Sequence, residues 1–60
     1  MYERYVKLRD ALQVTDAEVA RETGINSQVL YDWKAGKGKP KADKLKKLAK
    51  YFGVTIEYFV

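Results

Sequence analysis

The stretch Thr15–Trp33, TDAEVARETGINSQVLYDW, contains two short helix signals separated by one glycine turn. Thr15 followed by Glu18 has the spacing of a capping box, which predicts that a helix begins at residue 16. Gly24 favours a left-handed helix end, so we expect this helix to stop at residue 23. Asn26 is a good cap for a second helix, over residues 27–35. Because only three residues connect the two helices, they should meet at a steep angle.

The flanking segments also have helical apolar spacing. Tyr5, Leu8 and Leu12 share one face of a helix over residues 2–12. Beyond the glycine- and lysine-rich loop at 36–40, an apolar stripe predicts a helix over residues 42–52, and a short turn follows at 56–59. That stripe consists of Ala42, Leu45, Leu48, Ala49 and Phe52. The sequence therefore predicts an all-α single domain over residues 1–60, built as a compact bundle of four to five short helices.

Composition narrows the classes of function. The chain has 60 residues, no Cys and no His, and a net charge of +4 from 12 Lys plus Arg against 8 Asp plus Glu. Its size leaves little room for an enclosed substrate pocket, and the Gly36–Lys39 stretch lacks the spacing of a phosphate-binding Walker loop. We expect no catalytic residues, no metal site and no cofactor. No apolar run is long enough to span a bilayer, so a membrane partner is not expected. The positive charge favours an anionic partner.

The spacing of residues around the turn carries a family resemblance. Val19-Ala20, Thr23-Gly24-Ile25, Leu30 and Trp33 stand as in a helix-turn-helix, and the chain resembles the Cro/repressor-type (lambda-repressor-like) DNA-binding domain over essentially all 60 positions. This resemblance implies a sequence-specific binder of double-stranded DNA with the 27–35 helix in the major groove. We expect a transcriptional regulator, a phage-type or bacterial repressor, in the cytoplasm of a bacterial or phage-infected cell.

Four residues are predicted to contact bases. Leu30 and Trp33 set the buried side of the 27–35 helix, so the opposite side is available for DNA. By resemblance, family positions that touch bases are occupied here by Ser27, Gln28 and Asp32, and Tyr31 is added because it shares their side. Gln can bond bidentately to adenine, whereas Asp accepts from cytosine and repels phosphate. We therefore expect Asp32 to act mainly by excluding wrong bases.

The loop after the 27–35 helix is predicted to contact the DNA backbone. In the family that the chain resembles, this loop lies beside phosphates. Lysines there would release counterions and set the salt dependence of binding. The predicted backbone contacts are Lys34, Lys37, Lys39 and Lys41.

Four residues depart from the family pattern. Asp16 stands where the family commonly has a Gln that reaches a phosphate, and Lys34 stands where an acid often pairs with the arginine of the first helix, here Arg9. Arg9 must therefore find another acid, water or a phosphate. Gln13 occupies a position often held by glycine and would be strained if left-handed. Lys41 is a poor helix cap.

The apolar tail has two interpretations. It either closes the core beneath the first helix or contributes to a weak homodimer, for which the candidate residues are Ile56, Tyr58, Phe59 and Val60. A pair of subunits would favour a palindromic operator with two half-sites. The alternative function is a protein-interaction module on the same scaffold with only weak nonspecific affinity for DNA. The abrupt end at Val60 fits a piece of a longer regulator.

Overall fold

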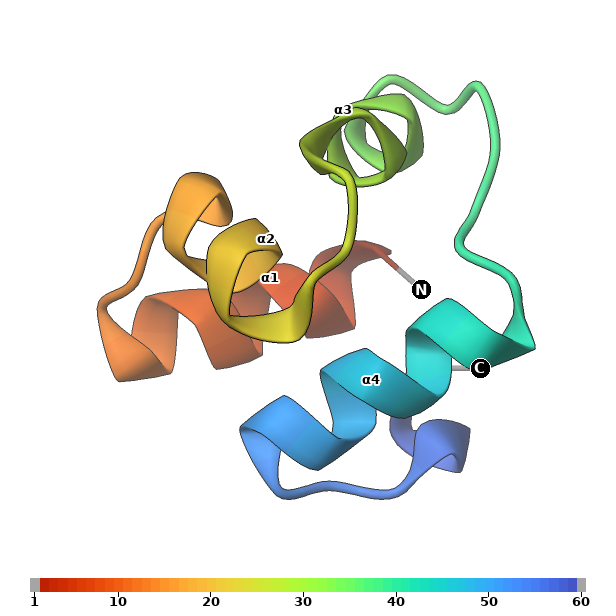
Figure 1. The fold of residues 1–60 in the computed structure, drawn as a ribbon. Coiled ribbons are helices and arrows are strands. Elements are labelled where there is room, and N and C mark those ends of the chain that lie inside the picture. Colours follow the sequence, from red (N-terminus) through yellow and green to blue (C-terminus); the bar gives the residue numbers. More distant parts are fainter. Residues whose placement is uncertain (1, 60) are drawn as a thin grey trace.

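The computed structural model describes residues 2–59 and is all-helical over that range (Figure 1). Four α-helices are followed by one turn of 3-10 helix, η1. This arrangement confirms the expected fold class. The elements are α1 (Tyr2–Leu12), α2 (Asp16–Thr23), α3 (Ser27–Lys34), α4 (Ala42–Phe52) and η1 (Ile56–Phe59).

Side-chain caps define where α2 and α3 begin. The Thr15 hydroxyl accepts a hydrogen bond from the Glu18 backbone N–H at 3.1 Å. The Asn26 side-chain oxygen accepts one from the Gln28 backbone N–H at 2.8 Å. Both caps satisfy N–H groups that the first helical turn leaves without a partner. Lys41 makes no side-chain cap for α4, as its chemistry predicts.

Residues in the left-handed region end the helices. Gly24 has a φ of 75°, as predicted for the end of α2. Gln13 has a φ of 57° after α1, where its Cβ makes the conformation costly. The next N–H groups fold back onto α1, from Gln13 to the Asp10 carbonyl and from Val14 to the Arg9 carbonyl. This is the Schellman pattern, completed here by a residue other than glycine.

The same pattern ends α3 one residue earlier than expected. Ala35 is the cap with a φ of −79°, and Gly36 turns the chain with a φ of 75°. The Gly36 N–H then donates to the Trp33 carbonyl at 3.2 Å, and the Lys37 N–H donates to the Asp32 carbonyl at 2.8 Å. These two bonds fix the direction in which the lysine loop leaves α3.

An aromatic cluster around Trp33 forms the centre of the core. The Trp33 ring lies 5.6 Å from that of Tyr2, 5.5 Å from that of Tyr5 and 6.3 Å from that of Phe59. Trp33 thus joins α3 to both α1 and η1. The buried residues of the core are Tyr5, Val19, Ile25, Leu30, Trp33, Leu45, Leu48, Ala49 and Phe59.

The apolar stripes expected on α1 and α4 are only partly buried. On α1, Tyr5 is buried and Leu8 is half-buried, but Leu12 is 52% exposed. Ala42, at the start of α4, is also exposed. The last turn of α1 remains uncovered because η1 packs against α1 nearer its start, where the Arg4 guanidinium donates to the Tyr58 carbonyl.

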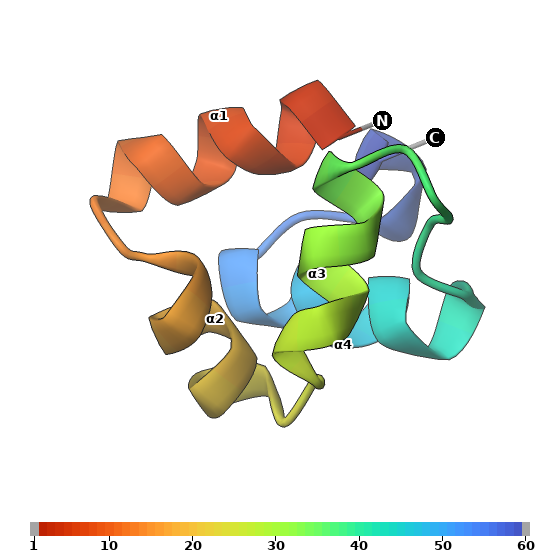
Figure 2. The same ribbon diagram turned by 90° about the horizontal axis from the view of Figure 1, so that it is seen from above.

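Helix α3 lies at the surface of the bundle, on the side opposite α4 and η1 (Figure 1). In the view turned by 90°, α3 stands in front of α4, with α1 and α2 beside it (Figure 2). One side of α3 therefore packs on the core and the other faces outward. The outward side of α3 is therefore a candidate binding surface.

Candidate functional site

The outward side of α3 carries polar and aromatic side chains that have no part in the core. Ser27 and Gln28 are exposed, Tyr31 is 59% exposed, and Asp32 is half-buried. Leu30 and Trp33 lie on the opposite side and are buried. The structure thus brings the four predicted base-contact residues onto one short helix whose position is set by buried neighbours.

Three of these four residues line a groove between α3 and the start of α2. This groove has a volume of about 330 Å³ and is lined by Asp16, Ser27, Gln28, Tyr31 and Lys34. Lys34, predicted as a backbone contact, therefore lies beside the predicted base contacts. The groove also contains one acid, Asp16, whose environment decides whether it would repel an anionic partner.

Asp16 is tied to two residues of α1. Its Oδ1 accepts a hydrogen bond from the Tyr5 hydroxyl at 2.6 Å and another from Arg9 Nη1 at 3.0 Å. Arg9 also pairs with the exposed Asp10 at 3.1 Å, and its guanidinium lies 5.8 Å from the centre of the Tyr5 ring. Asp16 thus fixes the start of α2 on α1, and the charge of Arg9 compensates its own.

The pKa shifts follow from this contact. Burial alone would raise the pKa of Asp16, but the hydrogen bonds from Tyr5 and Arg9, with a smaller effect of Lys34, bring it below its ordinary value. Burial and the bond to Asp16 raise the pKa of the Tyr5 hydroxyl. The bond to Asp16 likewise raises the pKa of Arg9. Asp16 therefore remains ionised and paired at neutral pH.

Two departures in the sequence thus have one structural explanation. Arg9 lacks an acid at position 34, and Asp16 supplies it from the start of α2. Lys34 is then left in the groove as a positive charge. From the sequence, residues 16 and 34 look like two unrelated departures, and the network around Asp16 is visible only in the structure. The signal available in the sequence was that the two departures change the charge in opposite directions: Asp16 adds a negative charge, and Lys34 replaces an acid with a base.

Gln28 and Asp32 contact each other along α3. Gln28 Nε2 donates a hydrogen bond to Asp32 Oδ1 at 2.9 Å. The two residues are four positions apart, which places their side chains on the same face of a helix. The side-chain amide of Gln28 is therefore held by a neighbour before any ligand is present.

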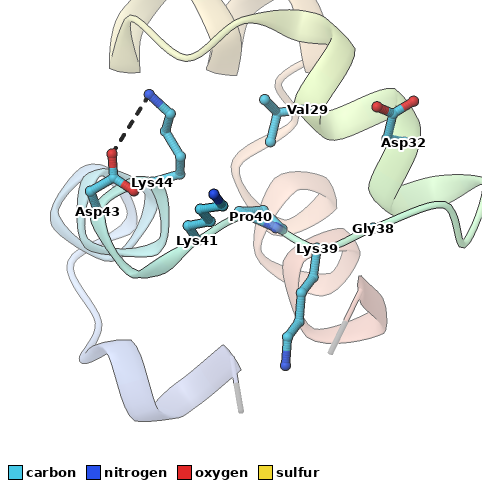
Figure 3. A pocket seen from close by; sticks show the side chains of 8 residues that line it. All are labelled: Val29, Asp32, Gly38, Lys39, Pro40, Lys41, Asp43 and Lys44. Atoms are coloured by element: carbon cyan, nitrogen blue, oxygen red, sulfur yellow. Dashed lines mark ion pairs between the residues drawn. The ribbon is translucent and has the colours of Figure 1, made fainter.

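The predicted backbone lysines fall into two groups. Lys34 lies in the groove beside α3, and the N–H of Lys37 is bonded to the end of α3. Lys39 and Lys41 lie farther along the loop and line a second cavity of about 320 Å³, together with Asp32, Asp43 and Lys44. Lys39 extends from the loop away from α3, and Lys44 reaches toward Asp43 at 3.8 Å (Figure 3). All four predicted lysines are exposed.

The apolar tail closes the core. Phe59 is 0% exposed and packs on Trp33. Tyr58 is half-buried beneath the Arg4 guanidinium, whose Cζ lies 5.6 Å from the centre of the Tyr58 ring, and Ile56 is also half-buried. The Phe59 side chain is therefore not available to a second subunit while this core is intact. Val60 lies outside the described residues.

Over residues 2–59, no group of three or more acidic residues is placed to hold a metal ion. None of the helices described there has both the length and the apolar character needed to cross a membrane.

Comparisons with known proteins agree with this geometry. A family model described as Helix-turn-helix matches residues 7–59. The HTH-type transcriptional activator BcrR of Enterococcus faecalis is 31% identical over 55 residues, which cover 92% of this chain and 27% of that protein. The chain thus spans about a quarter of the length of this curated relative. No solved structure was found to match the chain.

Proposed function

Because the chain belongs to the helix-turn-helix family of the Cro/repressor type, we propose that residues 1–60 form a single domain that binds double-stranded DNA and regulates transcription. The observation that carries this proposal is the outward face of α3. There Ser27, Gln28 and Tyr31 share one groove with Lys34. A short, rigid helix with such a face fits the major groove, where base edges differ in their donors and acceptors.

The proposed contacts divide by chemistry. Ser27, Gln28, Tyr31 and Asp32 belong to the base-facing side. The amide of Gln28 suits adenine and the ring of Tyr31 suits a thymine methyl group. Lys34 and Lys37 would meet the phosphates nearest α3, and Lys39 and Lys41 would meet phosphates farther along the loop. Phosphate contacts of this kind set affinity and salt dependence, whereas base contacts set the sequence.

The pairing of Asp16 with Arg9 supports the proposal. An isolated carboxylate at the start of α2 would repel a nearby phosphate. Here the guanidinium of Arg9 lies 3.0 Å from that carboxylate, and Lys34 lies in the same groove. The charge of Asp16 is therefore paired with Arg9, and Lys34 is a further positive charge that lines the groove itself.

Two finer parts of the proposal concern assembly and regulation. A single module of this size gains affinity by binding as a pair to a palindromic operator. The burial of Phe59 removes its side chain from the proposed dimer surface, which leaves Ile56 and Tyr58 as the candidates within residues 2–59. The sequence favours a repressor, whereas the relative from Enterococcus faecalis is named an activator. A reporter gene placed behind the selected operator would determine the direction of regulation.

The test is selection of bound duplexes from a random-sequence pool, followed by titration of the enriched duplex at several salt concentrations. Binding is followed with labelled DNA, because Trp33 is buried and its fluorescence is a poor probe of the protein surface. We expect an enriched palindrome and a steep loss of affinity with salt. Salt-dependent binding with no enriched sequence would instead favour the protein-interaction module with weak nonspecific affinity for DNA.

A further inference from the structure

We propose that Asp32 is a positioning residue, which sets the base preference of Gln28 by holding its side-chain amide in one orientation. This inference rests on the proposed DNA-binding function, and it changes the expected role of Asp32. The carboxylate acts through Gln28 and not through a base contact of its own. The structural basis is the hydrogen bond of 2.9 Å from Gln28 Nε2 to Asp32 Oδ1.

The chemistry of the pair decides which way the amide points. An ionised carboxylate only accepts hydrogen bonds, and the two ends of a Gln amide differ because the nitrogen donates and the oxygen accepts. Only the nitrogen end of Gln28 can therefore face Asp32. The Nε2 group has two N–H bonds, so donating one to Asp32 leaves one N–H and the Oε1 oxygen free.

This fixed arrangement suits one base better than its closest rival. The major-groove edge of adenine offers an N6–H donor and an N7 acceptor, whereas that of guanine offers two acceptors, N7 and O6. One free N–H beside Oε1 satisfies adenine. Against guanine, Oε1 would face the O6 oxygen. A Gln amide without Asp32 could turn so that its Nε2 group, as a donor, faces the acceptor edge of guanine.

Asp32 is itself held in place. Its backbone carbonyl accepts the Lys37 N–H at 2.8 Å, in the bond pattern that ends α3. Its carboxylate points away from the loop at residues 38–41 (Figure 3). The side chain that orients Gln28 therefore extends from a backbone fixed on both sides, by the helix and by the turn that follows it.

The charge of Asp32 gives the proposal a distinctive signature. A carboxylate near DNA weakens binding to every sequence, because it repels phosphate. Removing it should raise affinity for unrelated DNA and at the same time lower discrimination between adenine and guanine. A variant that merely loosened the fold would lower both affinities.

The experiment compares duplexes that carry an A·T or a G·C pair at the operator position where Gln28→Ala loses its preference. The proteins are the wild type, Asp32→Ala, Asp32→Asn, Gln28→Ala and the double variant Gln28→Ala/Asp32→Ala. Asp43→Ala is the charge-matched control, because this exposed acid on α4 pairs with Lys44 and not with Gln28. Thermal unfolding of each variant shows that it is folded.

We expect Asp32→Ala to reduce the preference for adenine over guanine by about fivefold or more, at the lower end of what a bidentate contact supplies. Asp32→Asn keeps an acceptor oxygen and should lose less. In the Gln28→Ala background, Asp32→Ala should change the preference by less than twofold, because the two residues act as one unit. Asp43→Ala should leave the preference unchanged.

The free protein offers a readout that needs no DNA. In nitrogen-edited NMR spectra, the side-chain amide signals of Gln28 should move in Asp32→Ala and stay in place in Asp43→Ala. Unchanged Gln28 signals in Asp32→Ala would overturn the proposal, as would an unchanged preference for adenine. An equal effect of Asp32→Ala with and without Gln28 would do the same.

The experiment distinguishes a failure of the proposed DNA-binding function from a failure of the proposed role of Asp32. If the wild type enriches no sequence from the random pool, both the proposed function and the role of Asp32 are wrong. If it enriches an operator and Asp32→Ala keeps the same preference at the Gln28 position, only the role of Asp32 is wrong.

Discussion

Arg9 and Asp16 meet where α1 joins α2, with the guanidinium Nη1 3.0 Å from the carboxylate Oδ1. The same oxygen accepts the Tyr5 hydroxyl at 2.6 Å. One carboxylate thus holds a charged and an aromatic residue of the preceding helix. This contact changes what a substitution at residue 16 should do. A glutamine there, the residue common in the family, would lose the ion pair that places α2.

Asp16→Ala should lower the free energy of unfolding by about 1–3 kcal/mol, because it leaves the hydroxyl of the buried Tyr5 without its partner. Asp10→Ala is the matched control. Asp10 is the other acid that pairs with Arg9, and its side chain is 64% exposed. Its removal should therefore cost less than about 0.5 kcal/mol. Urea unfolding followed by circular dichroism measures both. Equal costs would mean that the contact of Asp16 with Tyr5 and Arg9 adds nothing to stability.

Stability should also fall in acid because the pKa of Asp16 is lower in the folded protein than in the unfolded chain. The group therefore contributes stability above its unfolded pKa of about 3.9, and that contribution disappears as pH falls through the folded value. Thermal midpoints between pH 6 and pH 2 should drop more steeply for the wild type than for Asp16→Asn. Parallel profiles would exclude this residue as a source of the acid sensitivity.

Gln13→Gly should stabilise the protein by about 1 kcal/mol, because glycine tolerates the φ of 57° that Gln13 adopts. Gly36→Ala tests the reverse change. Its Cβ would meet no atom within 4 Å, so any loss of stability comes from the backbone φ of 75°. Denaturant midpoints should move in opposite directions for the two variants. A loss of stability in Gln13→Gly would show that the Gln13 side chain makes a favourable contribution.

Trp33→Ala should cost about 3–5 kcal/mol, which approaches the whole stability of a small domain. The ring contacts Tyr2, Tyr5 and Phe59, so its loss would open a cavity between three elements. Trp33→Phe retains an aromatic ring and should remain folded with a lower midpoint. Far-ultraviolet circular dichroism at 25 °C distinguishes the two. If Trp33→Ala remained folded, contacts other than those of Trp33 would supply most of the stability.

Lys37→Ala should weaken binding to all DNA sequences alike and flatten the plot of log affinity against log salt by about 0.9, the value for one phosphate contact. Lys34→Ala should do the same. Lys46→Ala is the control, since it removes an exposed lysine of α4, and α4 lies opposite α3 (Figure 1). Titrations at four salt concentrations give the slopes. An unchanged slope for Lys37→Ala would remove this residue from the backbone contacts.

The helix starts could be predicted because their causes are local. Thr15 and Asn26 each accept a hydrogen bond from the N–H of a residue two or three positions later. Both partners of each hydrogen bond are therefore close together in the sequence. The pair Gln28 and Asp32 was also visible as an i, i+4 spacing, although it was interpreted as two separate base contacts. Interactions of this range need no knowledge of tertiary structure.

The features that sequence analysis missed depend on how distant elements pack. The exposure of Leu12 follows from where η1 meets α1, which no local pattern specifies. The contact between Arg9 and Asp16 needs the angle between α1 and α2. Periodicity shows which residues share a face but not which part of that face another element covers.

The division of α3 into a buried and an exposed side has a consequence for how this protein can diverge. Leu30 and Trp33 hold the helix, whereas Ser27, Gln28 and Tyr31 have exposed side chains. Substitutions at the three exposed positions can therefore accumulate with little effect on folding. A descendant of this chain could acquire a new target preference through a series of variants that are all folded, without first losing the scaffold that presents them.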